Sequence, residues 1–389
     1  MLLRRAARVY SPDMFESEAD APPAAFRSVG GNPCWGGSAT APAHCLPAFH
    51  ILGVYQSGVR DMITRLMAHP TIADHPAVSP SFFSEVRKWS EYLRQLAPAT
   101  QRAAAGELIG EASAVTFHFV WVHQERFNQK YVKSMGRFWQ ACNARSAAEK
   151  AAVAHRDCMS AKMPEARGAE AEEAAAAGVR LQPPTLMRAV YGSSYEPRLI
   201  VLLRKPWTRM HAAFHNYVHY RNKYGDNSAG ELAWVRESVG AFRRCESAYS
   251  TEDCALRFES LDRLNEETFY HCDQLIKGMY HVFMPKWTHE FRDLLPLRAE
   301  QYWAQPKRVL GAALAFIGVA EPDADGWRRM LEVKRQLHGP RPPGGLPPVP
   351  EAVARELAAF YRDGLRQLVE QPPIRDAPDR RAWVEWSLL

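Results

Sequence analysis

The residues of this chain that are best placed for chemistry lie in a short loop between an apolar run and an amphipathic helix. Residues 49–54 are typical of a strand buried on both faces, and apolar side chains recur at helical spacing over 62–67, after Gly58. A strand that enters a helix through such a loop points several backbone N–H groups at one place, where the helix dipole favours an anion. Phosphate-handling α/β proteins usually have a lysine in this loop, whereas this chain has Gln56. The pattern therefore predicts an anion site with an unusual side chain.

Two arginines are candidates to supply positive charge to this anion site. Arg60 lies in the first helical turn, where its guanidinium could hold an anion in a bidentate manner; the alternative is a solvent-facing arginine that pairs with Asp61. Arg204 ends the apolar run 198–204, where open parallel sheets bind their ligands; the alternative is a salt bridge that caps the sheet. We expect Gly58 and Arg204 to lie side by side at the carboxyl edge of a parallel sheet.

A carboxylate and three histidines are the other candidates. Glu111 lies in a turn of small residues after an expected strand, where it can orient a ligand hydroxyl or act as a base, or cap the next segment. His211, His215 and His219 recur at every fourth position of the helix after Pro206, a spacing that can bind a metal. No Glu or Asp completes a known zinc pattern, so the sequence favours packing or surface roles for the histidines and predicts no metal site.

Composition limits the class of protein. The 389 residues are 47% hydrophobic and 24% charged, as in an ordinary globular protein. The net charge of +6 suits an anionic ligand, but it is diffuse and lacks the aromatic and basic pattern of a nucleic-acid-binding protein. No apolar stretch reaches the roughly 18 residues of a membrane span. The first residues lack the apolar run of a signal peptide, so we expect either a protein that is not secreted or a sequence that has lost its anchor.

Seven cysteines include two pairs that are close in the sequence, Cys34 with Cys45 and Cys245 with Cys254. Each pair can close a short loop in an oxidising compartment, and buried free thiols are the alternative. No Cys-x-x-Cys spacing of a zinc site is present.

The order of the expected elements predicts an α/β fold with a central parallel sheet and helices on both faces. Residues 1–44, rich in Pro, Gly, Ala and Ser, are expected to form an irregular arm. The main domain spans 45–370, with a flexible or helical insert at 146–180 that has few large apolar residues, and 371–389 form a tail. The expected strands are the runs at 49–54, 198–204 and 294–298, together with 107–116, where a strand is expected to lead into a loop of small residues.

Several segments, taken in order and with their spacing, resemble carbohydrate sulfotransferases. The resemblance is strongest to the type that 6-O-sulfates N-acetylgalactosamine 4-sulfate in chondroitin chains, and it runs from about Asn32 to Val369. The segments that carry it are NPCW (32–35), CLPAFHILG (45–53), RLMAHP (65–70), IGEASA (109–114), PPTLMRAV to PRLIVLLRKP (183–206), GMY (278–280) and FYRDGLRQLV (360–369).

The resemblance implies a three-layer α/β/α fold of the P-loop-like sulfotransferase kind, the donor 3′-phosphoadenosine 5′-phosphosulfate, and a carbohydrate or glycosaminoglycan-like acceptor. The resemblance also implies that the protein acts in the Golgi lumen. A basic loop near Arg341 would cover the adenine and the 3′-phosphate, although a solvated run of charges is an alternative. The donor contacts that the resemblance implies are Gln56, Ser57, Gly58, Val59, Arg60, Arg204 and Arg341.

The chain departs from the family at the residues that handle charge. The family loop Pro-Lys-x-Gly-Thr-Thr falls on residues 55–60 and only Gly58 is kept, because Gln56 stands where the family has its lysine. Ala212 stands where the family has the serine that accompanies Arg204. Two hypotheses follow. One is an active sulfotransferase in which Arg60 replaces the lysine; the other is a silent relative that binds glycan or nucleotide, or partners an active paralogue.

Overall fold

A sheet of four parallel strands forms the centre of the molecule, in the order β5-β4-β6-β7. The strands are β4 (Phe49–Ile51), β5 (Gly110–Ala112), β6 (Arg198–Leu203) and β7 (Leu294–Arg298). The computed structural model describes residues 6, 9–10, 21–76, 79–84, 88–119, 129–149, 152–179, 181–333 and 345–388.

The sheet is covered by helices on both faces, because its strands are apolar on both sides. On β6, Ile200 and Leu202 pack toward one face, whereas Leu199, Val201 and Leu203 pack toward the other. The first face is covered by α2 (Val59–Met67), α14 (Pro306–Ile317) and α15 (Ala324–Glu332). The second face is covered by α3 (Trp89–Ala104), α6 (Pro183–Tyr191) and α12 (Tyr280–Glu290). The predicted α/β fold with a central parallel sheet is therefore confirmed.

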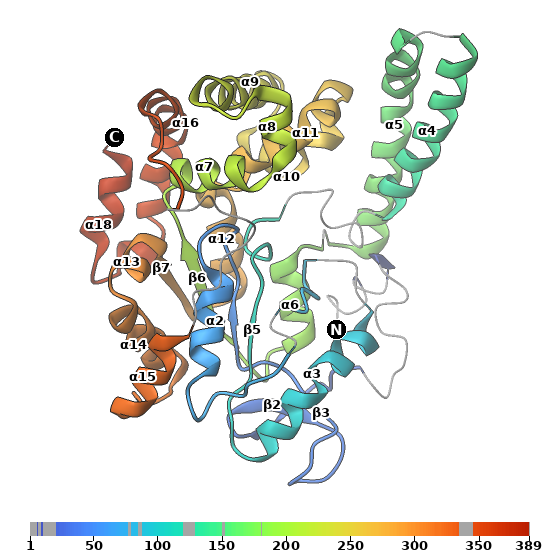
Figure 1. Ribbon diagram of the computed structural model, residues 1–389. Helices are drawn as coiled ribbons and strands as arrows, with labels where there is room; N and C mark the ends of the chain where they lie inside the picture. The colour runs from blue at the N-terminus through green and yellow to red at the C-terminus, as the bar shows by residue number, and fades with distance from the viewer. Residues whose placement is uncertain are drawn as a thin grey trace.

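A group of helices lies beyond the carboxyl ends of the strands (Figure 1). The sequence predicts one helix from Pro206 to about Tyr220, but the chain bends at Tyr217, whose backbone is extended, and a second helix follows. The group consists of α7 (Pro206–Asn216), α8 (Val218–Tyr224), α9 (Ser228–Glu246), α10 (Thr251–Leu261), α11 (Arg263–Ile276) and α16 (Glu351–Val369).

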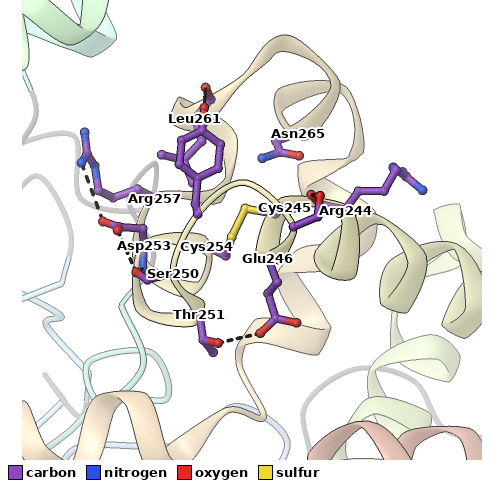
Figure 2. Close-up of a disulfide and its surroundings, with 12 residues drawn as sticks. Arg244, Cys245, Glu246, Ser250, Thr251, Asp253, Cys254, Arg257, Leu261 and Asn265 are labelled. Carbon is purple, nitrogen blue, oxygen red and sulfur yellow. Dashed lines mark hydrogen bonds and ion pairs between the residues drawn. A yellow bond between two sulfur atoms is a disulfide. The ribbon is translucent and has the colours of Figure 1, made fainter.

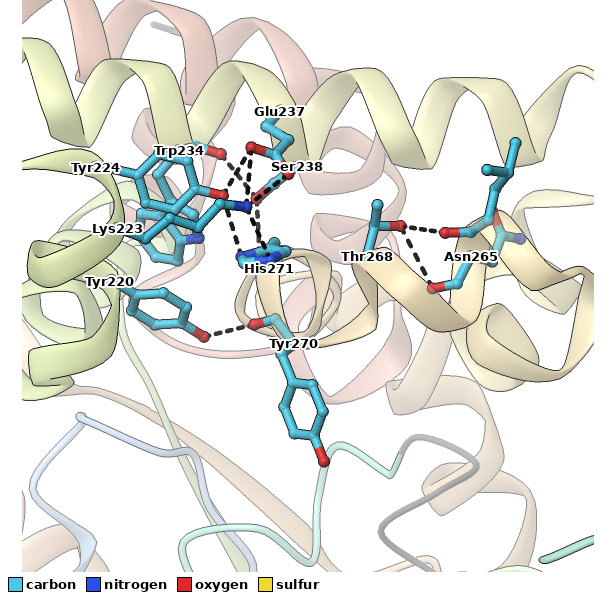
Figure 3. A network of polar contacts seen from close by, with 11 residues as sticks. Tyr220, Lys223, Tyr224, Trp234, Glu237, Ser238, Asn265, Thr268, Tyr270 and His271 are labelled. Carbon is cyan, nitrogen blue, oxygen red and sulfur yellow. Dashed lines mark hydrogen bonds and ion pairs between the residues drawn. The ribbon is translucent and has the colours of Figure 1, made fainter. Parts of the chain in front are cut away.

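A half-buried polar network joins α8, α9 and α11 (Figure 3). The Lys223 ammonium contacts Glu237 Oε1 at 3.1 Å and His271 Nε2 at 3.0 Å. The Tyr224 hydroxyl donates to Glu237 Oε2 at 2.8 Å and lies 3.1 Å from His271 Nδ1. Each side chain in this network therefore has partners on a neighbouring helix.

Two helices, α4 (Gln129–Glu149) and α5 (Ala152–Ala177), form a hairpin that extends away from the rest of the molecule (Figure 1). Tyr131, Phe138, Met159 and Met163 form a small apolar core between them. The hairpin therefore has its own packing, separate from the main core, and α5 occupies most of the predicted insert at 146–180.

The amino-terminal region contains a small antiparallel sheet of β1 (Arg27–Val29), β2 (Asn32–Trp35) and β3 (His44–Cys45), so the prediction of an irregular arm over 1–44 is wrong for this part. Gly30 and Gly31 both have positive φ, which suits the tight turn between β1 and β2. These strands are too short for a periodic pattern to reveal them.

The tail after residue 370 is also ordered, as α17 (Pro372–Arg375), α18 (Arg380–Val384) and a 3₁₀ turn (Glu385–Ser387). Trp383 and Trp386 of this tail are buried in the main core. None of the helices in the described ranges combines the length and the apolar character that a membrane span requires.

Three disulfides link six of the seven cysteines. The bonds Cys34–Cys45 and Cys245–Cys254 confirm the two expected pairs, and a third bond, Cys142–Cys158, joins α4 to α5. Figure 2 shows Cys245 at the end of α9 and Cys254 in α10, with the turn between them held by hydrogen bonds from Thr251 to Glu246 and between Ser250 and Asp253. The Cys272 thiol is buried and free.

Replacement of both Cys245 and Cys254 by alanine is expected to lower the free energy of unfolding by about 2–3 kcal/mol, because the bond closes a short loop and limits the unfolded chain. Urea unfolding of the variant and the wild type measures this difference. As a check, thiol titration of the denatured, unreduced wild type should give one free thiol per chain. A higher count, or an unchanged unfolding curve, would contradict the assignment.

Candidate functional site

The loop after β4 is fixed to β6 beyond the end of the strand itself. The Leu52 N–H donates to the Ile200 carbonyl at 2.8 Å, and the Val54 N–H donates to the Leu202 carbonyl at 2.9 Å. The chain then turns, with the Ser57 N–H bound to the Val54 carbonyl at 3.1 Å, and enters α2. The start of α2 is thereby placed at the carboxyl edge of the sheet.

Two residues of this loop have left-handed backbone conformations, Gln56 with φ 66° and Gly58 with φ 98°. Residues other than glycine rarely adopt this region, so the surroundings of Gln56 must hold it there. Gly58 is required for a further reason, because a Cβ at this position would overlap the indole of Trp303. Trp303 belongs to α13 (Ala299–Ala304), the short helix that follows β7.

Arg204 lies against this loop, as the sequence predicts. Its Nη1 donates to the Gln56 carbonyl at 2.7 Å, and its Nε donates to Thr208 Oγ1 at 3.1 Å. The Tyr280 hydroxyl donates to the Arg204 carbonyl at 2.7 Å and fixes the backbone there. The structure thus brings the Gly58 loop and Arg204 together through the Gln56 carbonyl.

Two buried donors at the start of α2 carry no hydrogen bond in the described part of the chain, Gln56 Nε2 and Ser57 Oγ. Gln56 is 7% exposed and Ser57 is fully buried. A buried donor without a partner costs about 1–3 kcal/mol, so these groups suit a ligand that accepts hydrogen bonds. No side chain of the described residues caps α2 either. The amide, the hydroxyl and the helix N-terminus together fit an anion.

The other loop residues have different surroundings. Arg60 is exposed on the first turn of α2, and the side chain of Val59 packs into the core, so only its backbone faces the loop. Asp61 is fully buried and accepts hydrogen bonds from Arg65 Nε at 2.9 Å and from the Tyr302 hydroxyl at 2.5 Å. Arg341, the remaining predicted donor contact, lies outside the described residues.

The sequence analysis did not identify Glu300 or Thr208 as site residues. Glu300 Oε1 accepts the Lys205 N–H at 2.9 Å and lies 3.4 Å from Thr208 Oγ1. Its Oε2 is buried, and no other described residue forms a hydrogen bond with it. Glu300 lies two residues after the end of β7, so the rule that ligands bind at the carboxyl ends of parallel strands would have found it.

The wall formed by α7 and α11 adds an aromatic and a cationic group. Tyr55 stacks on Tyr217 with ring centroids 5.8 Å apart, and its hydroxyl accepts from Asn216 Nδ2 at 2.7 Å. The Lys277 ammonium lies 5.8 Å from the Tyr55 ring and 2.6 Å from Asp273 Oδ2. Tyr55 therefore links the candidate loop to a buried ion pair.

Glu111 does not occupy a turn after a strand, as predicted, but lies in the middle of β5. It is 2% exposed, and its Oε2 accepts from the Tyr92 hydroxyl at 2.6 Å and lies 3.7 Å from His50 Nδ1. Burial raises the pKa of the Glu111 carboxyl from 4.5 to about 7 and lowers the pKa of His50 from 6.5 to about 3. Between about pH 3 and pH 7 both groups are therefore mainly neutral, and the pair belongs to the core. The small residues around Glu111 explain the error, because they suit a strand under packed helices as well as a turn.

No family model matches this sequence, and no curated protein matches it. Among solved structures, the chain is similar to one titled "Crystal Structure of Sulfotransferase from Alicyclobacillus acidocaldarius". The identity is 15%, the likeness covers 87% of this chain and 99% of that chain, and the TM-score is 0.42. This likeness is too weak for residue roles to be transferred, so the chemistry of the site rests on the residues of this chain.

Replacement of Gly58 by alanine is expected to lower the free energy of unfolding by about 2 kcal/mol or more, because φ is positive and the new Cβ overlaps Trp303. Gly106→Ala is the matched control, since Gly106 has a similar φ of 91° and open space around its Cα. Urea unfolding should give a larger loss for Gly58→Ala than for Gly106→Ala. Equal losses would show that Trp303 does not pack on Gly58.

Replacement of Glu111 by glutamine tests the buried neutral carboxyl. Because the folded pKa is raised, the carboxyl stabilises the wild type fully below pH 4.5 and loses this contribution as the pH rises through about 7. The stability of Glu111→Gln relative to the wild type should therefore improve by up to about 3 kcal/mol over this window. Urea unfolding from pH 4.5 to 8 measures it, with Glu172→Gln on exposed α5 as control. If the difference in free energy of unfolding between Glu111→Gln and the wild type does not change with pH, the raised pKa of Glu111 is wrong.

Proposed function

We propose that this protein is a sulfotransferase that moves a sulfuryl group from 3′-phosphoadenosine 5′-phosphosulfate to a carbohydrate hydroxyl. The observation that carries the proposal is the pair of buried donors, Gln56 Nε2 and Ser57 Oγ, at the start of α2 beside Arg204. Neutral donors, a helix N-terminus and a guanidinium in one place form a set that binds a large anion. This set of groups favours a sulfuryl-donor molecule that is anionic over one that is neutral.

The loop residues would stabilise the charge of the reaction. The donor supplies an activated sulfuryl group, and its departure leaves negative charge on a phosphate. The N–H groups at Gly58 and Val59, with the Gln56 amide and the Ser57 hydroxyl, would bind that phosphate, and Arg204 would bind the 3′-phosphate. Because these groups are held by the sheet, they need little rearrangement as the charge develops.

Two further residues would act on the acceptor side. We expect Arg60 to reach back over the first turn of α2 and bind the sulfuryl oxygens, in place of the missing lysine. Glu300 is a better candidate than Glu111 for the group that accepts the proton of the acceptor hydroxyl, because Glu300 lies at the sheet edge next to Thr208. Glu111, bound to Tyr92 inside the core, would act on the site only through the sheet.

One observation favours a second candidate function, a silent protein that binds nucleotide or glycan. Gln56 gives the loop a neutral amide where an ammonium would neutralise the leaving group. Removal of a single donor at a developing anion costs about 2.7–4 kcal/mol, which is enough to make turnover very slow. Binding would survive this change, since the helix N-terminus and Arg204 remain.

We also propose that the protein works in an oxidising compartment such as the Golgi lumen. Three disulfides support this, because such bonds persist outside the reducing cytosol. The carbohydrate nature of the acceptor rests on the resemblance of the sequence segments alone.

The test is calorimetric titration with adenosine 3′,5′-bisphosphate, followed by a donor-consumption assay over a panel of sugars. The wild type should bind the nucleotide, and Arg204→Gln should weaken binding at least about tenfold, since a charged hydrogen bond contributes about 1.5–3 kcal/mol. Lys307→Gln, on α14, is the control and should bind normally. Gln56→Lys should raise turnover by about 100-fold by restoring the cation.

The outcomes separate the two candidate functions. Nucleotide binding without turnover, in both the wild type and Gln56→Lys, would support the silent protein. Absence of nucleotide binding would overturn both functions. If Arg60→Ala leaves turnover unchanged, Arg60 does not replace the lysine.

A further inference from the structure

Two histidines and a glutamate from two helices meet on the side of α7 that faces α9. His211 and His215 lie one turn apart on α7, and Glu231 lies in the first turn of α9. One possible ligand atom from each residue lies within 4.8 Å of the others. His211 is 3% exposed and Glu231 is 2% exposed, whereas His215 is half-buried. His219, which the sequence groups with the other two, is exposed on α8 and outside this cluster.

The His211 imidazole lies between two hydrogen-bond acceptors. Its Nδ1 is 2.8 Å from Glu231 Oε1, and its Nε2 is 3.0 Å from the Pro347 carbonyl. A neutral imidazole has one N–H, so it can donate to only one of them. The buried side chain therefore needs either a second proton or another cation between Nδ1 and the carboxylate.

A metal ion at Nδ1 satisfies every group of this arrangement. Metal-bound histidines almost always donate their other N–H to a carbonyl or a carboxylate, and the Pro347 carbonyl is in that position for Nε2. The His215 ring stands edge-on to His211, with centroids 4.6 Å apart, so a His215 nitrogen is close by. Ligand atoms around a tetrahedral zinc ion are about 3.3 Å apart, a spacing that small side-chain rotations of this cluster can reach.

We propose that His211, His215 and Glu231 form a binding site for a divalent transition-metal ion, with Zn²⁺ as the best match. Two imidazoles and one carboxylate are a ligand set that suits zinc. The fourth position would face solvent on the half-exposed side of His215, near the charged pair of Arg221 and Asp226. No zinc pattern is visible in the sequence, because Glu231 lies on α9, which α8 separates from the two histidines on α7.

The ion would join α7 to α9 and so hold the helix that borders the candidate anion site. Thr208, one turn before His211, accepts the hydrogen bond from Arg204. A fixed α7 would therefore keep Arg204 in place. This site does not depend on the proposed sulfotransferase function, because its ligands are separate from the anion site.

The test uses the full chain after removal of metal with a chelator. Titration with Co²⁺ should give one equivalent of binding with the visible absorption of a four-coordinate ion, and Zn²⁺ should displace it. Loss of a residue that only hydrogen-bonds to a metal ligand lowers metal affinity by about 10–100-fold. Loss of a direct ligand, in His215→Ala or Glu231→Gln, should therefore lower it by at least about 100-fold. His219→Ala is the matched control and should bind like the wild type. Zn²⁺ should raise the melting temperature of the wild type and of His219→Ala only.

Two results would overturn the proposal. One is absence of stoichiometric Co²⁺ or Zn²⁺ binding by the wild type. The other is equal affinity of His215→Ala and the wild type, since His215 is half-buried and its removal leaves the His211–Glu231 contact intact. If Glu231→Gln does not fold, His215→Ala therefore decides the question. Neither measurement depends on enzymatic activity.

Discussion

The hydrogen bond from the Arg204 guanidinium to the Gln56 carbonyl is the contact on which the candidate site depends. The loop after β4 holds Gln56 in a left-handed conformation that the residue would not adopt alone. Arg204 is rigid in turn, since it follows β6 and is bound by Thr208 and Tyr280. The sheet thus fixes both partners. Without this contact the Gln56 carbonyl would lose the hydrogen bond that joins the loop to Arg204.

The residues of the candidate site follow the carboxyl ends of three adjacent strands. β4 leads to the loop and α2, β6 leads to Arg204 and α7, and β7 leads to Glu300 and Trp303. Trp303 packs on Gly58, and Glu300 binds the Lys205 N–H, so α13 contacts both of the other parts. A shift of α13 would therefore move the loop and the start of α7 together.

The parts of this arrangement that could be predicted are those set by local pattern and by the geometry of parallel sheets. The run RLIVLLR identifies β6, and a shared carboxyl edge brings Gly58 and Arg204 together. The parts that could not be predicted depend on contacts between distant segments. Trp303 against Gly58 and Glu231 against His211 leave no local signal. Glu111 illustrates a different limit, because a buried neutral carboxyl in a strand and a catalytic carboxyl in a turn have the same neighbours in the sequence.

The charge of the loop decides what the site can do. A helix N-terminus contributes about half a positive charge, and Arg204 contributes one more beside the Gln56 carbonyl. Together they can hold a phosphate, but neither replaces an ammonium at the bridging oxygen of a leaving group. Arg60 is the nearest cation in the sequence, and it stands exposed on the outer side of the first turn. In the proposed sulfotransferase, transfer would therefore require that the Arg60 side chain turn inward, whereas binding of a phosphate would need no group beyond those already in place.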